Sequence, residues 1–165
     1  MDSGTTIMGI IIALICALPV ILFYLNNYKK KRKKLSVLKR IEALNDCKIK
    51  NFDYSDTFLI GIESNNHLLF YVQWVGDEET LLKIDLSEMN NCQLINSTKS
   101  MGSKTSSYTI IEKVELAFKY IDRKNKDILI ELYRKQSGTT LSDELRIAEK
   151  WCKIVKNKID LQTKN

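Results

Sequence analysis

Two polar side chains stand where chemistry could occur: His67, at the edge of an expected hairpin, and Asp85, in the segment Ile-Asp-Leu-Ser-Glu. His67 is the only histidine, so a histidine-based metal site needs carboxylate or thiolate partners that the spacing does not supply. An acid at a strand end followed by Ser more often satisfies backbone donors than transfers protons. The chain also lacks a paired-acid motif, a glycine-rich phosphate loop and a nucleophile elbow. We therefore predict no enzyme, no catalytic residue, no metal site and no cofactor.

The four cysteines have no metal-binding or redox spacing. Cys47, Cys92 and Cys152 lie far apart in the sequence, and we interpret them as small core residues. Cys16 lies in an apolar N-terminal segment, where it could pack against another helix. Tyr133 and Trp151 could form a ligand platform, but both fall at positions that a hydrophobic core would occupy. The core interpretation is favoured for both aromatic residues.

A run of six basic residues follows the apolar N-terminal segment. It can act as a topology signal for a membrane helix, and it can attract anionic lipid headgroups at about 1 kcal/mol per residue near a charged membrane surface. Both roles are compatible. The residues predicted to contact lipid headgroups are Lys29, Lys30, Lys31, Arg32, Lys33 and Lys34.

The net charge of +6 is unevenly distributed along the 165 residues. Residues 29–40 contain eight Lys or Arg and no acid, whereas residues 41–165 contain 18 basic and 19 acidic side chains. A nucleic-acid-binding domain is expected to carry its positive charge on the folded module. The sequence therefore predicts no nucleic-acid partner.

Residues 7–25 contain no charged side chain and would span about 28 Å as a helix, close to the thickness of a membrane interior. We predict a single transmembrane helix here, after a short N-terminal segment of residues 1–6. The basic residues come only after the helix, so the positive-inside rule places the N-terminus outside and the remainder in the cytoplasm. The predicted location is the plasma (inner) membrane, with residues 26–46 as a polybasic stalk.

The stretch from residue 48 to residue 134 shows strand-like alternation of β-branched and aromatic residues between clusters of turn formers. In the sixth expected strand, Val114, Leu116 and Phe118 alternate with Glu115 and Ala117, so one face should be buried and the other wetter. Residues 64–66 and 76–79 are expected turns, and residues 99–108 are expected to form a mobile loop. The seven predicted strands cover residues 48–54, 57–63, 67–75, 80–86, 91–98, 109–121 and 126–134.

A helical period returns after Gly138, with apolar residues from Leu141 to Ile159 on one face. Thr140 or Ser142 can cap this helix, and its apolar stripe should cover an open end of the sheet. The helix residues predicted to anchor the core are Leu145, Ala148, Trp151 and Val155.

Seven antiparallel strands followed by one helix resemble the pleckstrin-homology-like superfold over residues 48–160. The resemblance extends to uncharacterised single-span bacterial membrane proteins that carry such a domain in the cytoplasm. It rests on residues Gly61, Asp85, Leu86, Ser87, Cys92, Tyr133, Ala148 and Trp151.

The resemblance implies an α+β fold in which an N-terminal transmembrane helix precedes a bent seven-stranded antiparallel sheet, or partly open barrel, capped by a C-terminal helix. The domain would cover residues 47–160, followed by a tail of residues 161–165. Lipid-binding members of the superfold carry basic residues in the first hairpin, but residues 52–57 here contain two acids and no base. Peptide-binding members use a groove that corresponds here to residues 91–98 and the helix of residues 141–160.

We predict a non-enzymatic, membrane-anchored interaction module that presents this domain to a cytoplasmic protein, whose identity the sequence does not indicate. The alternative is a sensor of anionic membrane surface that acts through the polybasic segment.

Overall fold

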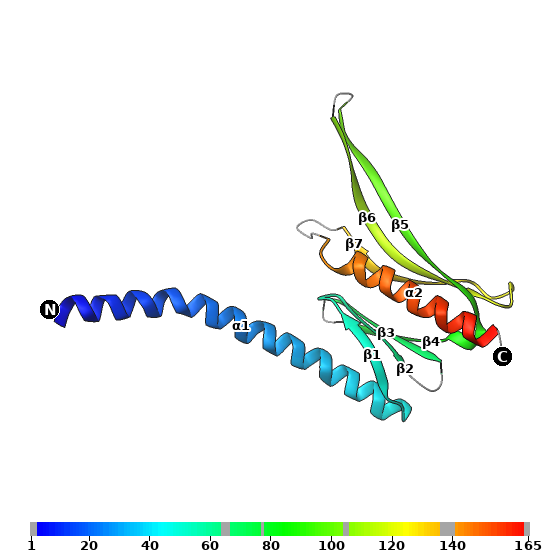
Figure 1. The fold of residues 1–165 in the computed structure, drawn as a ribbon, viewed down its shortest axis with the longest axis horizontal. Helices are drawn as coiled ribbons and strands as arrows, with labels where there is room; N and C mark the ends of the chain where they lie inside the picture. Colours follow the sequence, from blue (N-terminus) through cyan, green and yellow to red (C-terminus); the bar gives the residue numbers. More distant parts are fainter. Residues whose placement is uncertain (1–2, 64–66, 77, 104–105, 136–140, 164–165) are drawn as a thin grey trace. The chain divides into compact units, whose positions relative to one another are not determined.

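The computed structural model describes residues 3–63, 67–76, 78–103, 106–135 and 141–163 (Figure 1). The chain divides into two units, Met1–Cys47 and Lys48–Asn165.

The first unit consists of one helix, α1 (Ser3–Asn45), with Pro19 in its interior. The helix ends where Asp46 takes a left-handed backbone conformation, with a φ of 47°. The next amide, of Cys47, then donates to the carbonyl of Glu42 at 3.1 Å. This hydrogen bond closes the C-terminal end of the helix.

Within the described residues, no helix combines the length and apolar character that a membrane crossing requires. The predictions of a transmembrane helix over residues 7–25, a single-pass topology and a location in the plasma (inner) membrane are therefore wrong. The apolar run is not an element of its own, because α1 continues through the basic residues without a break over 43 residues. At 1.5 Å per residue such a helix measures about 65 Å, roughly twice the thickness of a membrane interior.

The second unit contains two antiparallel sheets. The four-stranded sheet has the order β1-β2-β3-β4, and the three-stranded sheet has the order β5-β6-β7. The strands are β1 (Ile49–Tyr54), β2 (Phe58–Glu63), β3 (Leu68–Val75), β4 (Glu78–Asp85), β5 (Met89–Ser103), β6 (Ser106–Tyr120) and β7 (Ile128–Arg134).

This arrangement corrects the prediction of one bent seven-stranded sheet or partly open barrel. The division falls between β4 and β5, where Leu86–Glu88 form a short 3-10 helix, η1. Asp85 caps η1, because its carboxylate accepts the backbone N–H and the hydroxyl of Ser87 at 2.9 and 2.6 Å. The cap ends β4 and redirects the chain, so β5 starts a new sheet instead of pairing with β4.

Two connections also differ from the sequence-based expectation. The loop predicted for residues 99–108 is wrong for its described part, because β5 continues to Ser103 and β6 begins at Ser106. Gly76 turns the chain with a φ of 62°, and Glu78 already belongs to β4. Residues 64–66, predicted as a turn, and Asp77 lie outside the described residues.

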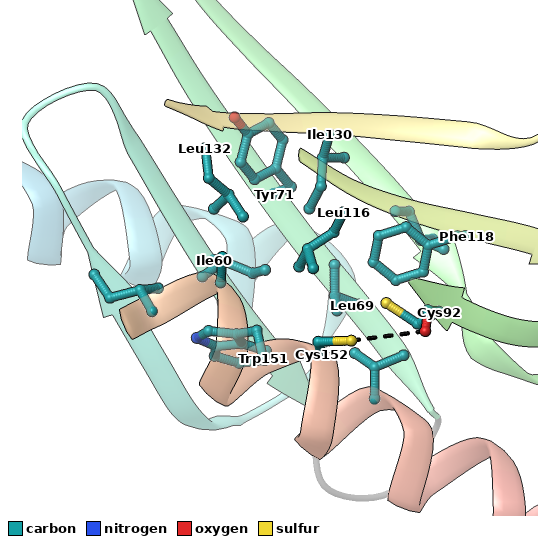
Figure 2. Close-up of a cluster of buried hydrophobic side chains, with 14 of the residues drawn as sticks. Ile60, Leu69, Tyr71, Cys92, Leu116, Phe118, Ile130, Leu132, Trp151 and Cys152 are labelled. Carbon is teal, nitrogen blue, oxygen red and sulfur yellow. Dashed lines mark hydrogen bonds between the residues drawn. The ribbon is translucent and has the colours of Figure 1, made fainter. Parts of the chain in front are cut away.

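The C-terminal helix, α2 (Glu144–Thr163), completes one hydrophobic core with both sheets. Figure 2 shows Ile60 from β2, Leu116 from β6 and Trp151 from α2 as members of one cluster of buried side chains. Of the predicted helix anchors, Ala148, Trp151 and Val155 have no exposed side-chain surface, and Leu145 is partly buried against the core.

Candidate functional site

The open edge of β5 is the feature that most resembles a binding site. β5 pairs with β6 over almost its whole length, from Met89 opposite Tyr120 to Ser103 opposite Ser106. No other described strand pairs with β5. One edge of this strand therefore presents backbone N–H and C=O groups that another extended chain can pair with.

Burial along β5 changes abruptly. Cys92 is fully buried, but Ile95 is 38% exposed and the residues from Asn96 to Ser100 are exposed. The third strand, β7, ends at Arg134 opposite Lys113, so the remainder of the β5–β6 hairpin extends past it as a two-stranded ribbon (Figure 1). Two-stranded ribbons are marginally stable alone, and pairing with a further strand stabilises them.

The helix α2 lies beside β5 at the start of this edge. The thiol of Cys152 donates to the carbonyl oxygen of Cys92 at 3.6 Å (Figure 2). Burial raises the pKa of the Cys92 thiol above its usual range, Cys152 acts in the same direction, and the positive charge of Lys156 opposes them. Cys152 and Lys156, one helical turn apart, therefore both lie on the side of α2 near β5.

A carboxylate on β1 holds α2 in place. The same oxygen of Asp53, Oδ2, accepts the indole N–H of Trp151 at 2.8 Å and the ammonium of Lys150 at 2.7 Å. Nearby, the hydroxyl of Ser55 donates to Glu144 at 2.6 Å, in the first turn of α2. The acidic first hairpin, which the sequence analysis judged unsuited to lipid headgroups, thus connects the four-stranded sheet to α2.

A second polar cluster lies on β6 and β7. Glu115 and Glu131 face each other across the two strands, and Lys113 reaches them at 2.6 and 3.7 Å respectively. Glu131 also forms hydrogen bonds with Arg134, which raise the pKa of that guanidinium. Each carboxylate faces a cation within the cluster, so the network stabilises the sheet and leaves little net charge for a ligand.

A cleft of about 200 Å³ adjoins this cluster, between the end of β3 and β7. Its walls include Trp74, Leu132 and Arg134. Because Arg134 is bound to Glu131, the cleft offers no uncommitted guanidinium for an anionic ligand. We therefore do not assign the cleft as the functional site.

The two residues considered for chemistry in the sequence analysis are Asp85 and His67. Asp85 acts as the cap that the sequence indicates. His67 is half-buried at the start of β3 with a φ of 55°, and its Nδ1 has no hydrogen-bond partner among the described groups. No group of three or more metal-ligating side chains occurs in the described residues.

The sequence analysis did not foresee that Cys92 and Cys152 would meet. None of the four cysteines forms a disulfide; Cys47, Cys92 and Cys152 are buried, and Cys16 is exposed. Cys92 and Cys152 are brought together by the packing of α2 on β5, a long-range contact that leaves no signal in the local spacing. Tyr133 is also largely buried in the core.

The polybasic segment lies within α1. Lys31, Arg32 and Lys33 are exposed, whereas Lys34 is buried, with 8% of its surface exposed. The guanidinium carbon of Arg32 lies 4.8 Å from the centre of the Tyr28 ring, a cation–π contact. The side chains of Lys29 and Lys30 lie outside those that the structure describes. The segment is therefore not a uniformly exposed row of six charges.

Comparison of the chain with protein-family models, with curated proteins and with solved structures gives no match. No comparison therefore tests the resemblance to the pleckstrin-homology-like superfold.

Proposed function

We propose that the second unit is a non-enzymatic protein-interaction module. An extended segment of a partner protein adds as a strand to the open edge of β5, beside α2. Backbone hydrogen bonds along β5 supply most of the affinity, and the side chains that face α2 supply selectivity.

One observation carries this proposal: β5 is a 15-residue strand that pairs on one side only, as far as the described strands extend. Natural proteins protect such edges with charges, prolines or very short strands. From Met89 to Ser103 this strand contains one charged residue, Lys99, and no proline. An unpaired edge of this length and low charge favours pairing with another chain.

The chemistry of the edge indicates the kind of partner. Gln93, Asn96, Ser97 and Thr98 are exposed and uncharged. The matching partner segment is extended, rich in β-branched residues and free of proline at the pairing positions.

The alternative prediction is a sensor of anionic membrane surface. It relies on the polybasic segment of α1, where the side chains of Lys31, Arg32 and Lys33 are exposed.

Proline substitution at neighbouring β5 positions tests the proposal. Successive residues of a strand direct their N–H groups alternately toward one edge and the other, so one of Ile95 and Asn96 presents its N–H at the open edge. Proline is tolerated where that N–H faces solvent and is disruptive where it pairs with β6. The full-length chain is first used to select peptides from a random display library.

Of Ile95→Pro and Asn96→Pro, we expect one to keep the unfolding midpoint of the parent chain but bind the selected peptides at least tenfold more weakly. Lys126→Pro, in the exposed β6–β7 connection, is the control and should leave peptide affinity unchanged. Parental affinity in the folded β5 variant contradicts the proposal.

A further inference from the structure

Two thiols from distant parts of the chain meet at the boundary between β5 and α2. Cys92 and Cys152 are 60 positions apart, and both are buried, with 0% and 8% exposure. Figure 2 shows their side chains lying next to each other, with the Cys152 thiol directed at the backbone of Cys92. Their contact joins the two elements that flank the proposed peptide site.

The two thiols differ in their surroundings. Cys92 comes from a strand and has no exposed surface, whereas Cys152 comes from α2 and keeps a small exposed fraction. Burial and the neighbouring Cys152 raise the pKa of the Cys92 thiol, and the positive charge of Lys156 opposes them only in part. A small oxidant therefore reaches Cys152 first, and Cys92 is the thiol placed to react with its product.

We propose that Cys92 and Cys152 form a reversible disulfide that fixes α2 to β5 when the protein meets a peroxide. In the first step the Cys152 sulfur attacks one oxygen of hydrogen peroxide, the O–O bond breaks, and sulfenic acid and water form. In the second step the Cys92 sulfur attacks the sulfenic sulfur, and the hydroxyl leaves as water with the proton of Cys92. Two thiols and one peroxide thus give one disulfide and two waters, and a dithiol reductant reverses the change.

The disulfide restrains the movement of α2 away from β5. It also closes a long loop of the unfolded chain, which raises thermal stability. Its regulatory consequence, that the oxidised form no longer adjusts the width of the site to bulky peptides, rests on the proposed function. The formation of the disulfide itself does not depend on the proposed function.

The test uses the full-length chain with Cys16→Ser and Cys47→Ser, so that only the two thiols of interest remain. After limited treatment with hydrogen peroxide, we expect the intact mass to fall by two hydrogen atoms. Proteolytic fragments containing Cys92 and Cys152 should be linked, and the thermal midpoint should rise by several degrees. Dithiothreitol should restore the parent mass and midpoint.

The matched controls are Cys92→Ser and Cys152→Ser in the same background. Cys92→Ser should accumulate a sulfenic acid at Cys152 that dimedone traps, because the second thiol is missing. Only sulfinic acid, only disulfides between two chains, or no change of mass in the parent background overturns the proposal.

Binding of display-selected peptides separates this inference from the proposed function. A linked form that binds bulky peptides several-fold more weakly than the reduced form supports both. Equal peptide affinity of the linked and the reduced form overturns the regulatory role but is compatible with the peptide site. No peptide binding in either form contradicts the peptide site, whether or not the disulfide forms.

Discussion

Asp53 joins two elements through a single carboxylate oxygen. That oxygen accepts the indole N–H of Trp151, a side chain with no exposed surface, and the ammonium of Lys150, which is about half exposed. A buried N–H without an acceptor costs more free energy than a partly exposed ion pair contributes. The indole bond should therefore dominate the effect of Asp53 on stability.

We predict that Asp53→Ala lowers the free energy of unfolding by about 1–3 kcal/mol. Asp53→Asn should cost less, because the amide oxygen can still accept the indole N–H. Lys150→Met should cost at most about 1 kcal/mol. Urea unfolding measures the free energy of unfolding of all three variants. The control is Trp151→Phe, which removes the indole N–H. In the Trp151→Phe background, Asp53→Ala should lower the free energy of unfolding by much less than it does in the parent chain. An equal cost in both backgrounds would refute this role.

Tyr71 provides a prediction about pH. Its hydroxyl donates to the carbonyl oxygen of Glu131, and burial, aided by the negative charge of Glu131, raises the pKa of Tyr71 above its ordinary value near 10.0. The unfolded chain then loses this proton at a lower pH than the folded chain. The stability due to Tyr71 is therefore fully present below about pH 10 and is lost as pH rises further, by up to about 1.4 kcal/mol per pH unit.

The pH dependence is measured by urea unfolding between pH 8 and pH 11. Both compared chains, with Tyr and with Phe at position 71, carry Cys92→Ser. This removes the Cys92 thiol, whose raised pKa would also make stability decline as pH rises. Tyr71→Phe should reduce the decline above about pH 10. An identical decline with Phe at position 71 shows that Tyr71 ionises in the folded state as readily as in the unfolded state.

At the scale of elements, the β1–β2 pairing depends on Gly61. A Cβ atom at this position would lie 2.8 Å from Cγ2 of Ile49 and 3.3 Å from Cβ of Phe52. Ile49 is buried, so its side chain has little room to move. We predict that Gly61→Ala destabilises the fold by about 1–3 kcal/mol through overpacking.

Ile49→Ala removes the atom that the new Cβ would meet. The double variant should therefore be more stable than the sum of the two single costs predicts. Strict additivity in urea unfolding would show that Gly61 is needed for another reason.

The sequence predicted single elements better than their pairing. Alternation located the strands near their observed positions, because side chains of a strand face opposite sides in turn. The spacing from Ala148 to Ile159 likewise predicted a buried helix face. The division into two sheets was missed, because it depends on how the Asp85 cap redirects the chain over only three residues of η1.

Amino-acid composition gave a wrong prediction at the β5–β6 hairpin. The Ser- and Lys-rich stretch after Thr98 was expected to be a loop, but cross-strand pairing with β6 determines its conformation. The open edge of β5 was a possible groove in the sequence analysis, and the actual strand is longer than predicted. The meeting of Cys92 and Cys152 and the bond from Asp53 to Trp151 depend on contacts distant in sequence, which local periodicity does not encode.

At the scale of the whole molecule, the chain divides into two units, Met1–Cys47 and Lys48–Asn165. The core formed by the two sheets and α2 lies within the second unit. We predict that residues 48–165 fold cooperatively without α1. Circular dichroism should show mixed strand and helix content, and thermal unfolding should show one transition. A mainly helical spectrum or a gradual transition would contradict this prediction.

The central claim is that a partner strand adds to the open edge of β5. Amide hydrogen exchange of the full-length chain, with and without a display-selected peptide, tests it most directly. Strand addition predicts slower exchange at alternate amides of β5 between Asn91 and Ser100, since these are the groups that form new backbone hydrogen bonds. Protection confined to β7, to the cleft near Trp74 or to α1, with β5 exchanging as in the free protein, would contradict the claim.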